Sequence, residues 1–122
     1  MEIEPVTVNG TPVAVVSGEG KLITDAQSAL ELAMSVKYAA GADRFAISKK
    51  QVCGEFFVLS TGIAGEILQK LCNYRVKIAI FGDFSHYTSK PLRDFIYESN
   101  NGDNVFFTAS KEEALQKLSS AK

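Results

Sequence analysis

Two stretches of the chain combine hydroxyl, carboxyl and glycine residues in a way that is typical of anion- or partner-binding loops. The first is Ser60-Thr61-Gly62, directly before an apolar helical pattern. The second begins at Gly82, directly after an apolar strand, and carries polar groups into the next helix: Asp83, Ser85, Ser89, Lys90 and Arg93. A helix start offers free backbone amides and a partial positive charge, which favour an anion. These nine residues form our candidate phosphoacceptor or anion-binding site.

A plainer interpretation exists for the same residues. Ser60 or Thr61 can serve only as a helix N-cap, with Gly62 and Gly65 present for close packing. Asp83 can cap its own loop through an Asx-turn. The two stretches form one site only if both follow the carboxyl ends of parallel strands, where α/β sheets bind ligands.

Other chemistry has less support in the residues. His86 is the only histidine and Cys53 and Cys72 are the only cysteines, too few and too scattered for a zinc site. Nucleophile-elbow, Walker and dinucleotide-binding glycine motifs are absent. Ser60, His86 and Asp83 could be assembled into a hydrolytic set, but their spacing matches no motif. We therefore expect no catalytic residues, metal or cofactor, and two reduced core thiols.

Composition restricts the class of protein. The chain has 122 residues, 46% of them apolar, which suits a single domain with one core, residues 1–122. The net charge of −1 argues against nucleic acid as a partner, because that needs a basic face. The first residues lack the features of a signal peptide, and no apolar run reaches the ~18 residues of a membrane span. We expect a cytoplasmic protein with no membrane contact.

The first half of the chain predicts a hairpin, a helix and a strand. Residues 3–8 and 12–17 are β-rich and joined by Asn9-Gly10, and Pro5 suits an edge strand. A capping box of Thr24 and Gln27 predicts a helix over 25–38. Residues 44–48 form a buried strand and 49–55 a polar connector, whereas 56–59 have no clear period.

The second half alternates helices and strands. A helix runs from Gly62 with its apolar face at Ile63, Ala64, Ile67, Leu68, Leu71 and Cys72. Residues 76–81 predict an interior strand. Ser89 and Pro91 open the next helix, residues 104–108 form the last strand, and Ser110 opens the last helix. The expected fold is therefore α/β, with one mixed β-sheet in the order ββαβαβαβα: an N-terminal hairpin and then parallel βα units.

Residues 56–102 carry a family resemblance. The stretches Ser60 to Lys70, Asn73 to Lys77, and Gly82 through Asn100 resemble a bacterial family of uncharacterised proteins, domain-of-unknown-function family 4180. The resemblance covers nearly the whole chain. It implies a bacterial cytosolic protein and no established activity.

A second resemblance concerns the fold. The hairpin start, the βα units and Ser60-Thr61-Gly62-Ile63 before an apolar helix are similar to STAS domains, the anti-sigma-factor antagonists. Members carry Asp-Ser-Ser/Thr-Gly there, and a partner kinase phosphorylates the second hydroxyl, which by position is Thr61. Leu59 stands where the family has Asp, which is a departure from its pattern.

Three hypotheses follow for function. The first is a non-enzymatic, STAS-like regulatory or partner-binding module controlled at Ser60-Thr61. The second is a small-molecule or anion-binding protein with Lys90 and Arg93 as counter-charges. The third is a small hydrolase that uses Asp83. The expected partner is a protein or a small anionic ligand, and self-association into a homodimer is left open.

Overall fold

The sheet begins with the hairpin that Asn9-Gly10 predicts. In the computed structural model, which describes residues 1–122, Asn9 and Gly10 adopt φ values of 51° and 80° and connect two antiparallel strands. The remaining neighbours in the sheet pair in parallel, in the spatial order β1-β2-β3-β4-β5. The strands are β1 (Glu2–Val8), β2 (Thr11–Ser17), β3 (Arg44–Ser48), β4 (Lys77–Phe81) and β5 (Val105–Thr108). The predicted α/β class and element order are confirmed.

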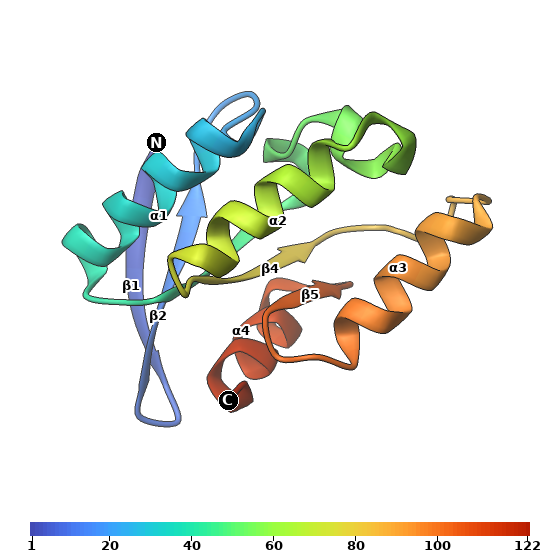
Figure 1. The fold of residues 1–122 in the computed structure, drawn as a ribbon. Coiled ribbons are helices and arrows are strands. Elements are labelled where there is room, and N and C mark those ends of the chain that lie inside the picture. Colours follow the sequence, from blue (N-terminus) through green and yellow to red (C-terminus); the bar gives the residue numbers. More distant parts are fainter.

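Four helices cover the two faces of this sheet unequally (Figure 1). The helices are α1 (Ala26–Ala40), α2 (Ile63–Asn73), α3 (Lys90–Asn100) and α4 (Lys111–Ser120). The first three lie on one face and contribute to a large apolar core, whereas α4 alone covers the other face. Three short 3-10 turns replace the expected polar connector and the unplaced residues after it: η1 (Lys49–Gln51), η2 (Gly54–Phe57) and η3 (Leu59–Thr61).

Side-chain size explains the asymmetry of the two faces. Phe45, Ile47 and Ile80 point into the large core, and each is fully buried. Alternate residues on the same strands are small, with Ala46 and Ala79 beneath α4. Because successive strand residues point to opposite faces, the small row lets a single helix lie close to the sheet. Each large buried side chain contributes about 1.5–3 kcal/mol through burial.

Helices α3 and α4 start at the predicted caps, Ser89 and Ser110, whereas α1 does not. Ser89 caps α3, and its Oγ accepts a hydrogen bond from Leu92 N at 3.4 Å. Helix α1 is capped by Asp25 rather than Thr24, because Asp25 and Ser28 form the capping box. Both residues before the helix could cap it, and the extended backbone of Asp25 selects the carboxylate.

Each edge of the sheet carries a feature that hinders an added strand. On β1, Pro5 lacks an amide hydrogen, and the strand lies at the edge as predicted. On β5, the Asn100 side chain takes the place of a neighbouring strand: its Oδ1 accepts from Phe107 N at 2.7 Å and its Nδ2 donates to Phe107 O at 3.1 Å. The sheet therefore offers little for strand-to-strand association.

Candidate functional site

The sequence-predicted site residues lie at the carboxyl edge of the parallel strands. Strand β4 ends at Phe81 and leads through residues 82–89 to α3, while the turns η2 and η3 lead to α2 (Figure 1). Rings connect these two loop segments: the Phe57 ring lies 5.9 Å from Phe84 and 5.5 Å from Tyr87. No hydrogen bond joins residues 60–62 to residues 82–89. The two stretches are thus on the same edge and share an aromatic contact rather than a polar one.

Asp83 is the anchor of its own loop. Its Oδ1 accepts hydrogen bonds from Ser85 Oγ at 2.6 Å and from Ser85 N at 2.9 Å, which is an Asx-turn. These two bonds, the hydroxyl first, hold the pKa of Asp83 below its usual value, with smaller contributions from the charges of His86 and Lys49. A carboxyl that stays ionised has no proton to give at neutral pH, so this geometry suits a loop anchor better than a general acid.

Lys49 is the residue that sequence reasoning missed. Its Nζ donates to Asp83 O at 2.8 Å and lies 3.5 Å from His86 Nε2. The same ammonium lies over three aromatic rings, 4.6 Å from the centroid of Tyr87, 5.5 Å from Phe84 and 5.9 Å from Phe57. No carboxylate pairs with it. Lys49 therefore ties the 82–89 loop to the end of β3 through a carbonyl and ring faces.

Gly82 permits this arrangement. A Cβ atom at Gly82 would lie 2.8 Å from Lys49 Cβ, closer than real Cβ atoms approach. In the sequence, the visible signal was a glycine directly after a predicted strand. The side chain that requires the space is that of Lys49, which lies 33 residues earlier in the chain. The close approach at Gly82 is therefore a tertiary feature.

The Ser60-Thr61-Gly62 stretch is closed by its own hydrogen bonds. Thr61 Oγ1 lies 2.8 Å from Val58 O and 3.0 Å from Glu55 O, and it accepts from Ile63 N at 3.2 Å. Gly62, in the left-handed region at φ 79°, is the N-cap of α2, so neither hydroxyl residue occupies the cap position itself. The Ser60 side chain is exposed and has no hydrogen-bond partner in the chain. Of the two hydroxyls, only that of Ser60 is free.

Gly62 and Gly65, the two glycines at the start of α2, have different structural explanations. Gly62 is required by its positive φ, since nothing lies within 4 Å of a Cβ placed there. Gly65 also has open space and lies inside α2 with an ordinary backbone. The close-packing explanation is therefore wrong for both.

The cations at the start of α3 point to solvent. Lys90 Nζ pairs with Asp94 Oδ2 at 2.6 Å, and the two side chains are 80% and 56% exposed. Such a pair contributes little to stability and already neutralises Lys90. Arg93 is exposed without a partner. No basic concavity forms around the two residues.

An open hollow lies beside Asp83. It has a volume of about 530 Å³ and lies between the β4–α3 loop and the residues after β5, with lining from Gly82–Ser85, Ile96, Phe107, Thr108 and Ala109. Half of the lining residues are hydrophobic, and Asp83 is the only ionisable one. The hollow therefore combines a partly apolar lining with a single carboxylate.

The side chains that commonly bind metal ions do not form a cluster in this structure. The chain holds no group of three or more His, Cys, Asp and Glu residues arranged to bind a metal ion.

Cys53 is buried, but Cys72 is exposed, so the expectation of two core thiols is wrong for Cys72. Its neighbour Leu71 fills the core position of α2 instead.

None of the helices has the length and apolar composition that a membrane crossing requires.

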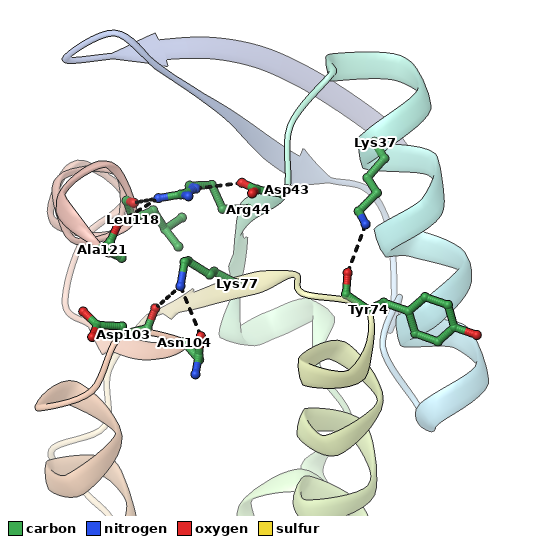
Figure 2. Close-up of polar contacts among 9 residues, drawn as sticks. All are labelled: Lys37, Asp43, Arg44, Tyr74, Lys77, Asp103, Asn104, Leu118 and Ala121. Atoms are coloured by element: carbon green, nitrogen blue, oxygen red, sulfur yellow. Dashed lines mark hydrogen bonds and ion pairs between the residues drawn. The ribbon is translucent and has the colours of Figure 1, made fainter.

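The opposite, amino edge of the sheet gathers cationic side chains (Figure 2). Arg44 Nη1 donates to Leu118 O at 2.6 Å and Ala121 O at 3.2 Å, at the end of α4. Lys77 Nζ donates to Asp103 O at 2.8 Å, and to Asn104 Oδ1 at 3.1 Å. All of these acceptors lie on the segments that surround β3 and β4, so the two cations are held in place by carbonyl groups.

The chain belongs to the DUF4180 family, a domain of unknown function, whose pattern it matches over residues 8–118. Comparison with curated proteins and with solved structures gave no match. The class of protein is therefore an α/β domain with one mixed sheet, and its family prescribes no activity.

Proposed function

We propose that this protein is a non-enzymatic partner-binding module whose recognition surface is the carboxyl edge, formed by residues 54–61 and 82–89. The supporting observation is that polar side-chain atoms at this edge form hydrogen bonds within the protein itself. Lys49 Nζ and Asp83 Oδ1, the groups best suited to chemistry, hold loops in place. A surface held rigid in this way loses little conformational entropy when a partner binds.

The hollow beside Asp83 indicates the chemistry of the partner. Its apolar lining includes Phe84, Ile96 and Phe107, and the Asp83 carboxylate stays ionised at its rim. A protein segment that presents an apolar side chain next to a lysine or arginine is complementary to both features. We therefore propose a protein partner with a basic, apolar contact segment.

Control by phosphate at residues 60–61 belongs to this proposal, in the manner of STAS domains. A phosphate adds roughly two negative charges at neutral pH. On Thr61 it would displace the contacts with Glu55 O and Val58 O, and so reshape the turn before α2. On Ser60 it would add charge without breaking a bond. Either modification would change the surface that a partner meets.

The test compares two charge reversals in partner capture from the native cells. Asp83→Lys reverses the charge at the hollow, and Glu31→Lys makes the same change on the exposed surface of α1. A partner that binds through the hollow is expected to bind Asp83→Lys at least 10-fold more weakly, and Glu31→Lys like the wild type. Circular dichroism checks that both variants are folded. Equal retention of every captured protein by the two variants would refute the proposed surface.

A further inference from the structure

We propose that the hollow at the amino edge of the sheet binds the phosphate group of a small molecule. This hollow has a volume of about 340 Å³ and lies at the opposite edge from the partner-binding surface. Four of its eight lining residues are cationic and one is acidic: Arg44, Arg75, Lys77 and Lys122 against Asp43. An excess of positive charge in a concave site favours an anion.

Two of the cations are neighbours in the sheet. Arg44 of β3 and Lys77 of β4 are direct register partners, on adjacent parallel strands. Like charges in such positions repel each other and destabilise a sheet when nothing offsets them. Asp43 offsets part of the charge by accepting from Arg44 Nε at 2.9 Å. An additional anion between the strands would offset the rest.

These two cations are also held in fixed positions. Carbonyl groups bind Arg44 Nη1 and Lys77 Nζ, as Figure 2 shows. The Arg44 Nη2 group has no hydrogen-bond partner in the chain, and Lys77 has used two of its three donor hydrogens. Donors that are already oriented lose little freedom when they bind an anion.

Arg75 supplies the free guanidinium. Its backbone has φ 58°, a left-handed conformation that glycine or asparagine adopts with less strain. It follows the end of α2, where glycine is the common choice. The Arg75 side chain is exposed and has no polar partner, so it is free to bind a phosphate with two parallel hydrogen bonds. The left-handed position therefore carries a charged side chain that makes no polar contact within the chain.

Negative groups near the hollow reduce the charge of its four cations. The end of α2 carries a partial negative charge, but Lys37 Nζ already binds its Tyr74 carbonyl at 3.0 Å. Asp103 Oδ1 lies 3.5 Å from the backbone N of the lining residue Lys122, and the Asp103 carboxylate pairs with no cation. The size of the hollow suits a phosphorylated small molecule. The net charge of −1 disfavours a long polyanion, which needs an extended basic face.

The test uses inorganic phosphate and pyrophosphate as probes in amide NMR titrations at constant ionic strength, with sodium chloride as the control. Wild-type protein is expected to show saturable shifts at Arg44, Arg75, Lys77 and Asn104. Arg75→Gly removes the guanidinium and relieves the left-handed backbone, so it is expected to bind at least 10-fold more weakly without losing thermal stability. Arg93→Ala, which removes an exposed arginine from α3, is expected to bind like the wild type.

Three results would overturn the proposal. They are an absence of saturable shifts with either probe, equal binding by Arg75→Gly and wild type, and shifts that map to Lys90 and Arg93. If Arg75→Gly is less stable than expected, Arg75→Gln gives the same comparison with a side chain kept at position 75 and without the charge. None of these results bears on the partner-binding surface, which lies at the other edge.

Discussion

A methyl group added at Gly82 tests how tightly the candidate site is built. Ser48 and Phe81 are register partners, so Lys49 and Gly82 follow them side by side where β3 and β4 end. A Cβ at position 82 would lie 2.8 Å from Lys49 Cβ and 3.3 Å from Lys49 Cδ. The backbone at Gly82 cannot easily move away from Lys49, because the Gly82 amide donates a hydrogen bond to Thr108 O at 2.9 Å. Overpacking of this kind costs about 1–3 kcal/mol.

Urea unfolding followed by circular dichroism measures the effect. Gly82→Ala is expected to lower the free energy of unfolding by about 1–3 kcal/mol, and the melting temperature by roughly 4 °C for each kcal/mol. A double-mutant cycle identifies the cause. Lys49→Ala keeps the Cβ atom and should not relieve the contact, whereas Lys49→Gly removes that atom and should.

Two outcomes would contradict this reasoning. One is a cost for Gly82→Ala within the ~0.5 kcal/mol that an ordinary surface substitution shows. The other is the same cost in the Lys49→Ala and Lys49→Gly backgrounds, since the contact would then not involve Lys49 Cβ. The first result would mean that the loop after β4 adjusts at little cost, and the second that the cost arises from another contact of position 82.

Three further predictions concern the rest of the chain. Gly62→Ala is expected to destabilise the fold by about 1–2 kcal/mol, because alanine is strained at a left-handed φ. Gly65→Ala, inside α2, should stabilise the fold by about 0.5–1 kcal/mol. Urea unfolding midpoints that move in the same direction for both variants would contradict this. Hydrogen bonds from Ser28 hold the pKa of Asp25 below its ordinary value of 3.8. Its contribution to stability is therefore complete above that pH and is lost as the pH falls through the lower, folded value. Unfolding midpoints at pH 7 and pH 3 should differ less for Asp25→Asn than for wild type, and an equal difference would rule this carboxyl out as a source of acid sensitivity. Finally, a thiol reagent should label the exposed Cys72 in the folded protein and reach Cys53 only after unfolding, as mass spectrometry of the two peptides would show; labelling of both at one rate would place Cys53 at the surface.

Local signals in the sequence predicted most of the elements. Asn9-Gly10 accepts positive φ and predicted the hairpin, and Ser89 predicted the start of α3, because both effects act within a few residues. The same kind of signal was ambiguous at Thr24 and Asp25, where two neighbouring side chains could cap one helix. It also gave no prediction for residues 56–59, whose 3-10 turns bury Phe56 and Phe57 without following an apolar period.

The sites depended on the register of the strands, which no local pattern contains. Lys49 meets Gly82, and Arg44 meets Lys77, only because β3 and β4 pair in one particular alignment. A shift of a single residue would send each of these side chains to the other face of the sheet. The sequence by itself determined the elements and their order, because hydrogen bonding and burial within a segment decide these. The tertiary structure decided which charges and loops meet, because those contacts join residues more than 30 positions apart.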